Sequence, residues 1–248
     1  MTPAAADRDT SPYDLLPDLI RVWRVHLHRV PASFDRLEQL LSRDEMDRAR
    51  RFHFERDRRR FTLARGALRT ILGGYLRIDP KSIVFGYGPQ GKPFLAPAGS
   101  SIRFNVAHSE ELALIAVSRE RELGVDVEFV RSMTWAEQIP ERFFSPREAA
   151  VFRSLPHDLA EPAFFACWTR KEAYIKARGG GLTIPLDHFD VSLEPGKPAA
   201  LLEVRDDPIE ASRWDMVELQ PASGYAGALV VQGKGWRFGY RDWPGQAR

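Results

Sequence analysis

The chain has 248 residues, enough for one large domain or two of roughly 120 residues each. A hydrophobic content of 44% supports a packed core and excludes wholesale disorder, while the formal net charge of +2 points to no class of partner. The single cysteine, Cys167, excludes an internal disulfide and a cysteine-based metal site, and it suits a reducing cytoplasm. Because the sequence has no run of about 18 apolar residues, we expect no membrane-spanning helix.

The first half of the chain alternates between strand and helix patterns. Residues 1–17 are rich in Ala, Pro and Asp, and we expect a flexible tail there and not a signal peptide. Residues 20–27 alternate apolar and polar side chains, which predicts a half-buried strand. Ser42 and Glu45 match a capping box that starts a helix. Helical spacing then continues to the glycine pair 73–74, which should weaken or end the next helix.

Residues 48–69 are the most basic part of the chain, with nine arginines against Glu55 and Asp57. Most such basic segments form a solvent-exposed face of a helix. Arginine forks also match phosphate oxygens, so the segment is a candidate anion site. Binding of nucleic acid is a third reading, although the segment lacks aromatic interleaving and any known motif.

Two acidic residues occupy alternate positions in the strand-like sequence 124–128. Because successive side chains of a strand point to opposite faces, Asp126 and Glu128 share one face, about 7 Å apart. We expect Val125, Val127 and Phe129 to point the other way, into a core. A solvated edge strand would explain the two acids, and so would a hard divalent cation with oxygen ligands.

The second half of the chain repeats the style of the first. Residues 145–148 are a strong helix start, and a long helix over 163–178 stops at three consecutive glycines. Strands are expected at 102–106, 112–117, 189–193, 200–204, 214–219, 226–232 and 236–240. The predicted fold is α/β (α+β), with two pseudo-symmetric halves that each pack helices on a small antiparallel sheet and an active site in the cleft between them. The predicted ranges are 18–121 and 122–241, followed by a tail over 242–248.

Three side chains lie on one face of the helix over 163–178. Trp168, Glu172 and Lys176 are spaced four residues apart, so an ordinary helix salt bridge is one reading. Combined with Asp126 and Glu128, however, Glu172 completes a set of three carboxylates. A site that holds Mg²⁺ against phosphates also needs cationic side chains. The candidates are Lys92, Lys171, Lys176, His108 and the arginines of 48–69. The absence of a P-loop and of GxGxxG argues against the usual nucleotide triphosphatases.

At this point the sequence resembles the Sfp-type 4′-phosphopantetheinyl transferases. Order and spacing agree from about residue 20 to 232, and the segment at 168–182 together with 124–128 is highly specific. The matching segments are 91–93, 104–109, 124–128, 142–145 with Glu148, and 168–173 through 176–182. One position departs from the family pattern, because Ala107 stands where many members have Ser.

The resemblance implies transfer of the phosphopantetheine arm of coenzyme A to a serine of an acyl or peptidyl carrier protein, with release of adenosine 3′,5′-bisphosphate. It also implies a cytoplasmic monomer that uses Mg²⁺, or Mn²⁺, and meets an acidic carrier protein transiently, without nucleic acid or membrane. A basic and apolar surface for this carrier is expected after the Asp-Val-Glu strand. Its candidates are Arg131, Met133, Trp135, Arg142, Phe143 and Phe144, with core packing as the alternative for at least one of the two phenylalanines.

The resemblance further assigns roles to residues by position. Asp126, Glu128 and Glu172 match the metal ligands, and Glu172 is also the candidate base, acting directly or through water. The catalytic set is Glu172, Lys176, Asp126 and His108. The residues expected to contact coenzyme A are Lys176 at the pyrophosphate, Lys92 and His108 at the nucleotide phosphates, Arg48, Arg60 and Arg65 at the 3′-phosphate, and Lys171 and Ser109. The hydroxyl contact missing at Ala107 is either lost or supplied by Ser109 or by the backbone.

Two other functions stay open at this stage. A non-enzymatic polyanion binder would use the basic segment 48–69 and would bind any polyanion with strong salt dependence. A Mg²⁺-dependent phosphohydrolase would release phosphopantetheine to water without a carrier.

Overall fold

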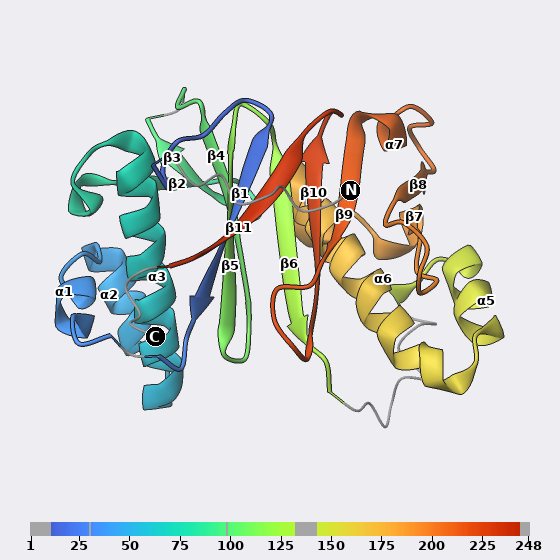
Figure 1. Cartoon of the computed structure of the whole chain (residues 1–248), viewed down its shortest axis with the longest axis horizontal. Helices are drawn as coiled ribbons and strands as arrows, with labels where there is room; N and C mark the ends of the chain where they lie inside the picture. The colour runs from blue at the N-terminus through green and yellow to red at the C-terminus, as the bar shows by residue number, and fades with distance from the viewer. Residues whose placement is uncertain (1–10, 30, 98, 132–142, 244–248) are drawn as a thin grey trace.

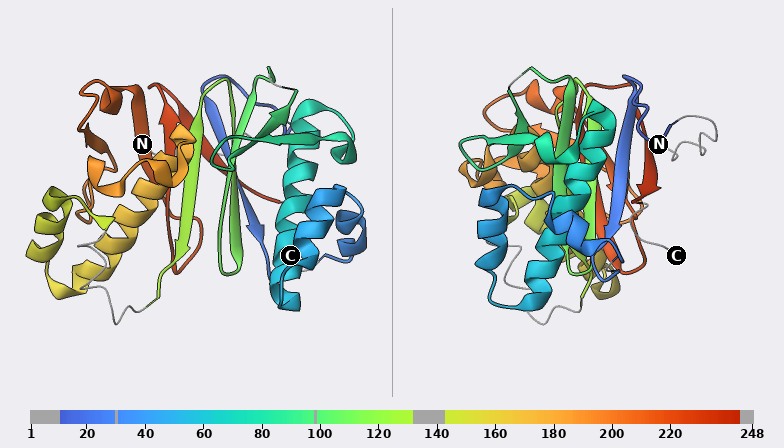
Figure 2. Two further views of the ribbon diagram at one scale, coloured as in Figure 1. Left: turned by 180° about the vertical axis from the view of Figure 1, so that it is seen from behind. Right: turned by 90° about the vertical axis from the view of Figure 1, so that its left-hand side faces the viewer.

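The computed structural model describes residues 11–29, 31–97, 99–131 and 143–243. Its elements form four layers, which Figure 1 shows from left to right. Helix α3 (Glu55–Leu76) covers the first sheet, the two sheets lie in the middle, and helix α6 (His157–Arg178) covers the second sheet. Seen from behind in Figure 2, α3 and α6 again lie on opposite outer sides. The predicted α/β class with helices packed on small sheets is confirmed.

The first sheet has four strands in the order β11-β1-β5-β4. Strand β1 (Leu19–His26) pairs antiparallel with β5 (Leu112–Arg119), which pairs antiparallel with β4 (Ile102–Ser109). On its other edge, β1 pairs in parallel with β11 (Arg237–Asp242). The sheet is therefore mixed, and its last strand comes from the far end of the chain.

The second sheet is antiparallel, with β6 (Leu123–Phe129), β10 (Tyr225–Gln232) and β9 (Trp214–Leu219) in that order. Two hairpins flank the sheets: β2 (Val84–Tyr87) with β3 (Pro93–Ala96), and β7 (Phe189–Val191) with β8 (Leu201–Val204). The remaining helices are α1 (Phe34–Glu38), α2 (Arg43–Arg50), α5 (Pro146–Ser154) and α7 (Glu210–Arg213), with 3₁₀ turns at Pro80–Ser82, Gly181–Thr183 and Leu186–His188.

The core consists of three apolar layers, one on each side of each sheet. One layer lies between α3 and the first sheet and contains Trp23 and Val25, and another lies between α6 and the second sheet. The third layer joins the two sheets and contains Ile20 and Val22 of β1. Strand β1 is therefore buried on both faces, and the prediction that it is half-buried is wrong because the second sheet covers its other face.

Local signals place two helix starts correctly. Ser42 with Glu45 and Ser145 with Glu148 both form capping boxes. The glycine pair 73–74, in contrast, does not end α3, which continues to Leu76. A Cβ on Gly74 would lie 2.4 Å from the ring of Tyr13, so that glycine admits an aromatic ring against the helix.

The first and last residues that the structure describes pack more closely than the sequence predicted. Tyr13 stacks on Trp23, and Leu15 is buried. At the other end, Asp242 belongs to β11 and Trp243 is only 3% exposed, although both were assigned to a tail. Pairing with a strand more than 200 residues away leaves no local pattern in the sequence.

Helix α6 begins at His157, six positions before the predicted start, and contains Pro162. Pro162 is the sixth residue of the helix, beyond the N–H groups that have no partner inside it, so its missing N–H removes one helical hydrogen bond, to the Asp158 carbonyl. The end of α6 is as predicted: Gly179 caps it in a left-handed conformation, with φ of 70°.

Candidate functional site

Glycine 124 determines how closely α6 approaches β6. A Cβ at this position would lie 2.1 Å from the backbone oxygen of Ala173 and 2.3 Å from the backbone nitrogen of Ala177. The glycine therefore lets the helix backbone lie directly on the strand. Because Gly124, Asp126 and Glu128 alternate along β6, they share the face that meets α6. Val125 and Val127 face the layer between the sheets as predicted, whereas Phe129 is 39% exposed and not in the core.

Asp126 is buried beside Lys176. The Lys176 ammonium donates a hydrogen bond of 2.5 Å to Asp126 Oδ1. Among the described residues, no donor reaches Asp126 Oδ2, although this oxygen is buried. Burial raises the pKa of Asp126, the ion pair with Lys176 opposes the rise, and the neighbouring Glu128 and Glu172 add to it, so that the pKa is about 7.

Glu172 lies one helical turn before Lys176 on α6. Burial raises its pKa, Lys176 opposes the rise, and Glu128 adds to it. Glu172 and Lys176 line a cavity of about 260 Å³, whose other walls come from the 90–93 loop, β4 and the glycines after α6. The three carboxylates that the sequence singled out therefore influence one another electrostatically at the junction of β6 and α6.

The chemistry of these side chains suits a hard cation. Carboxylate oxygens are the ligands that Mg²⁺ prefers, and the unpartnered Oδ2 of Asp126 is a buried acceptor that needs a positive partner. Within residues 11–29, 31–97, 99–131 and 143–243, however, no group of three or more His, Cys, Asp or Glu side chains is arranged to hold a metal ion. The side chains are instead engaged with Lys176 and Ser109. The metal assignment of Asp126, Glu128 and Glu172 stays a prediction.

His108 is exposed near the end of β4, where cations from both halves of the chain meet. Desolvation lowers the pKa of His108, and the charges of Lys176, Arg48 and Arg60 lower it as well, against Glu128. Lys176 comes from α6, and the two arginines come from α2 and α3. The fold therefore surrounds this histidine with positive charge, which is the environment that an anion would favour.

The three arginines predicted at the 3′-phosphate differ in their surroundings. Arg48 is exposed, packs over the Phe61 ring at 5.4 Å, and lines a hollow of about 670 Å³ with Asp44, Asp47, Arg51, Phe52 and Tyr87. Arg60 pairs with Glu110 and Glu111 at the β4–β5 turn. Arg65 donates to Glu45 and to the Tyr87 hydroxyl, each at 2.5 Å. Arg48 is thus the best placed of the three to meet a ligand, and the contacts of all three with coenzyme A stay predictions.

Much of the positive charge of the 48–69 segment is balanced within the protein. Arg58 and Arg59 both pair with Glu55, and Arg69 is buried on Glu45. The Arg58 and Arg59 pairs are exposed and lie within α3, whereas the buried Arg69 ties α3 to α2. Arginines paired in this way offer fewer free charges to a polyanion.

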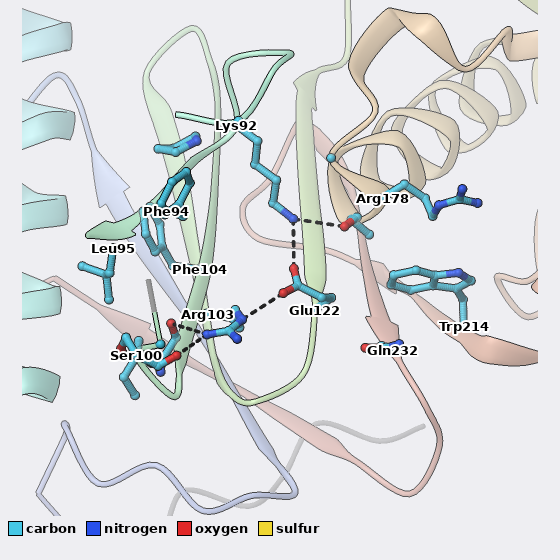
Figure 3. A pocket seen from close by; sticks show the side chains of 16 residues that line it. Lys92, Phe94, Leu95, Ser100, Arg103, Phe104, Glu122, Arg178, Trp214 and Gln232 are labelled. Carbon is cyan, nitrogen blue, oxygen red and sulfur yellow. Dashed lines mark hydrogen bonds and ion pairs between the residues drawn. The ribbon is translucent and has the colours of Figure 1, made fainter. Parts of the chain in front are cut away.

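Lys92 lies between two cavities. Its ammonium donates to the backbone oxygens of Ala177 (3.0 Å) and Leu123 (3.2 Å), and it pairs with Glu122 at 3.4 Å. Figure 3 shows this contact and the Arg103–Glu122 pair at 2.8 Å, in a largely apolar cavity of about 460 Å³. Burial lowers the pKa of Lys92, and Glu122 opposes this effect. In the structure Lys92 ties the 90–93 loop to β6 and α6, and its contact with a nucleotide phosphate stays a prediction.

Lys171 does not contact the site, and its assignment to coenzyme A is wrong. The side chain is 0% exposed and lies 2.7 Å from Glu148 Oε2. It also donates to the backbone oxygens of Leu186 and Phe189. Helical spacing explains the error: Lys171 precedes Glu172 by one residue and so points to a different side of α6, into the core.

We expect Lys171→Met to destabilise the protein by about 3–5 kcal/mol, because it leaves the carboxylate of Glu148 buried without its cation. Urea unfolding measures the loss. Lys197→Met is the matched control, since Lys197 forms an exposed pair with Glu194 and its loss should change stability by about 0.5 kcal/mol or less. If Lys171→Met were as stable as the wild type but bound coenzyme A more weakly, Lys171 would be a coenzyme A-binding residue after all.

Ser109 and Asn105 of β4 both bond to β6. The Ser109 hydroxyl donates to Glu128 Oε2 at 2.8 Å and accepts the Phe129 N–H, so it faces β6 in this structure. Asn105 Oδ1 accepts the Val125 N–H. Asn105 was not predicted as a site residue, although a polar amide inside an apolar strand indicates that it needs a buried hydrogen-bond partner. Ala107 between them is buried in the apolar layer that joins the sheets.

The residues expected to form a carrier surface divide into three groups. Arg131, just after β6, is exposed. Met133, Trp135 and Arg142 lie outside the described residues. Phe144 is a core residue with 4% exposure, and Phe143 packs on Trp168 with ring centroids 5.5 Å apart. At least one of the two phenylalanines therefore has the core role that was considered as the alternative. In the ranges that the structure describes, no helix has the length and apolar character needed to cross a membrane.

Comparison with known proteins identifies both halves of the chain. Residues 28–120 match a family described as 4′-phosphopantetheinyl transferase, N-terminal, and residues 122–230 match the 4′-phosphopantetheinyl transferase superfamily. The chain is 41% identical over 225 residues to the 4′-phosphopantetheinyl transferase HetI of Nostoc sp., covering 90% of this chain and 92% of HetI.

Two proteins of Bacillus subtilis are also similar. A 4′-phosphopantetheinyl transferase is 33% identical over 178 residues, which cover 71% of this chain and 77% of that protein. The 4′-phosphopantetheinyl transferase Sfp of strain 168 is 29% identical over 159 residues, which cover 64% of this chain and 69% of Sfp. The chain belongs to the 4′-phosphopantetheinyl transferase superfamily.

Proposed function

We propose that this protein transfers the 4′-phosphopantetheine group of coenzyme A to a serine hydroxyl of an acyl or peptidyl carrier protein. The observation that carries the proposal is the junction of β6 and α6, where Asp126, Glu172 and Lys176 meet beside a cavity between the two family-matched halves. The serine oxygen forms a bond to phosphorus, the bond from phosphorus to the bisphosphate oxygen breaks, and adenosine 3′,5′-bisphosphate leaves.

Cations on this chain are placed to hold an anionic substrate. Lys176 lines the 260 Å³ cavity and would bind the pyrophosphate, while Arg48 would meet the 3′-phosphate from its exposed position on α2. His108 lies within the electrostatic influence of both, and binding of an anion would favour its protonated form. These residues orient the substrate, and phosphoryl transfer depends mostly on positioning and charge stabilisation.

Asp126, Glu128 and Glu172 would hold the divalent ion, for which we propose Mg²⁺ or Mn²⁺. When bound, the ion would neutralise charge on the pyrophosphate and on the leaving bisphosphate. Asp126 offers its unpartnered Oδ2 for this purpose while Oδ1 stays on Lys176. Since one chain supplies every one of these residues, we propose that a cytoplasmic monomer acts on a transiently bound acidic carrier.

Glu172 is the proposed acceptor of the serine proton. Its pKa is raised by burial and by Glu128, which makes it a better base than an exposed carboxylate, and the rate should rise with pH as Glu172 ionises. We expect Glu172→Gln to lower kcat by about 100-fold or more. Carrier labelling measures kcat, and calorimetry with coenzyme A shows whether the substrate still binds. A wild-type rate for Glu172→Gln would remove this residue from the mechanism.

The function is tested by incubating the protein with a fluorescent coenzyme A analogue, Mg²⁺ and a panel of apo carrier proteins. Labelling of a carrier, its loss when the carrier serine is replaced by Ala, and its loss in EDTA are expected. Release of phosphopantetheine to water without a carrier would instead show a phosphohydrolase. Tight Mg²⁺-independent DNA binding without labelling would show a polyanion binder.

A further inference from the structure

Strands β4 and β6 are the facing edges of the two sheets. Among the described strands, no backbone ladder joins them. Side chains take its place: Asn105 Oδ1 accepts the Val125 N–H at 2.9 Å, and Ser109 Oγ accepts the Phe129 N–H at 3.1 Å. Both bonds join residues 20 positions apart in the sequence, so they keep one register between the strands.

The two bonds lie on the same face of β4, because Asn105 and Ser109 are four residues apart in a strand. Ala107 lies between them on this face and packs in the apolar layer that joins the sheets. Val125 and Phe129 are likewise four residues apart on β6, and they bracket Asp126 and Glu128. The register of β4 against β6 therefore sets where the two carboxylates lie relative to His108.

Ser109 makes a second contact that Asn105 does not make. Its hydroxyl has one hydrogen, which it donates to Glu128 Oε2 at 2.8 Å, while its oxygen accepts the Phe129 N–H. One side chain thus holds both the end of β6 and the carboxylate of Glu128. A hydroxyl engaged in this way has no hydrogen left to donate to coenzyme A, although the family resemblance made Ser109 a candidate for that contact.

We propose that Ser109 is a positioning residue that orients the Glu128 carboxylate across the junction of the two halves. Asn105, in contrast, contributes only to the strand register. The inference rests on the proposed transferase function, in which Glu128 is a ligand of the divalent ion. Residues that hydrogen-bond a metal-binding carboxylate typically change metal affinity or activity by about 10–100-fold when they are removed.

The test compares Ser109→Ala, Ser109→Thr and Asn105→Ala in the full-length chain. Binding of Mn²⁺ in the presence of coenzyme A is followed by the electron paramagnetic resonance of the free ion, and labelling gives kcat and the KM for coenzyme A. We expect Ser109→Ala to weaken Mn²⁺ binding and lower kcat by about 10-fold each, with an unchanged KM for coenzyme A. Ser109→Thr, which keeps the hydroxyl, should restore both.

Asn105→Ala is the matched control for strand register. It removes one bond to β6 and leaves the Ser109–Glu128 bond in place, so we expect a lower unfolding temperature and a smaller loss of Mn²⁺ affinity than in Ser109→Ala. A raised KM for coenzyme A in Ser109→Ala, with unchanged Mn²⁺ affinity, would overturn the proposal by showing a substrate contact. A lower unfolding temperature alone would overturn it too, as would absence of Mn²⁺ binding by the wild type. Failure of the wild type to label any carrier would count against the proposed function, whereas Mn²⁺ affinity would still decide the role of Ser109.

Discussion

Asp126→Asn will abolish carrier labelling and at the same time stabilise the metal-free protein above pH 7. The ordinary pKa of this carboxyl is 3.8, and in the folded protein it is about 7 because the group is buried with one oxygen unpartnered. A folded-state pKa above the unfolded value means that the folded protein holds the proton more tightly. The protonated Asp126 carboxyl therefore contributes its full stabilisation of the folded state below pH 3.8, and this stabilisation is lost as pH rises through about 7.

The size of the effect follows from the shift. A difference of about three pKa units corresponds to an upper limit of about 4 kcal/mol above pH 7, and we expect on the order of 2 kcal/mol for the amide. Removal of the negative charge leaves Lys176 without Asp126, but the Lys176 side chain is 29% exposed and can reach water. The cost of losing this ion pair is therefore smaller than the cost of keeping the buried charge.

Thermal unfolding of wild type and Asp126→Asn in EDTA, from pH 5.5 to 8.5, measures this effect. The unfolding temperature of the wild type should fall toward high pH more steeply than that of the variant. Added Mg²⁺ should raise the wild-type temperature at pH 8 and leave the variant unchanged, since a ligand stabilises only the state that binds it. Asp206→Asn, at a carboxyl 87% exposed, is the control that should change neither profile. A variant that is less stable than wild type by the same amount at every pH would contradict the assignment.

Gly124→Ala will separate α6 from β6 and remove activity. The new methyl group would lie 2.1 Å from the Ala173 oxygen and 2.3 Å from the Ala177 nitrogen, and backbone atoms in the middle of a helix cannot rotate away. Overpacking of cores typically costs about 1–3 kcal/mol, and contact with backbone places this case above that range, at about 4 kcal/mol or more. A shifted α6 also carries Glu172 and Lys176 away from Asp126, so labelling should fall by at least about 100-fold.

Urea unfolding and labelling of Gly124→Ala and Gly88→Ala provide the measurement. Gly88 is the control because a Cβ there would meet only the Lys92 oxygen, at the ordinary distance of 3.7 Å. We expect Gly88→Ala to stay within about 0.5 kcal/mol of wild type. If Gly124→Ala were as stable and as active as Gly88→Ala, the close contact between α6 and β6 would not be required for the geometry of the site.

Local patterns predicted the parts of the site that depend on one element at a time. The alternation along 124–128 placed Asp126 and Glu128 on one face of a strand, and the four-residue spacing placed Glu172 and Lys176 on one face of a helix. The capping boxes at Ser42 and Ser145 started helices as expected. Each of these features is decided by backbone geometry within a few residues, which is why a single sequence contains it.

Other features were predicted incorrectly or not at all because they depend on contacts between distant segments. Burial of Lys171 depends on α5, which supplies Glu148, and on the turn at Leu186 and the start of β7 at Phe189, which each supply a carbonyl group. The engagement of Arg65 with Glu45 and Tyr87 depends on the packing of α2 and of the β2–β3 hairpin against α3. Neither strand of this hairpin was predicted. The sequence therefore shows where the cationic residues are, but it does not show which of them are free of partners within the protein and could bind a ligand.

The family follows from the sequence alone, through the likeness to one group of transferases. The sequence also predicts as site residues the carboxylates of the Asp-Val-Glu strand together with Glu172 and Lys176 on one helix. Only the tertiary structure decided which cations face the cleft and which hold the core together. It also decided that β11 joins the first sheet and that Ser109 and Asn105 keep β4 in register with β6. The physical reason is that periodicity records which face a side chain occupies, whereas the partner on that face comes from chain segments brought together only by folding.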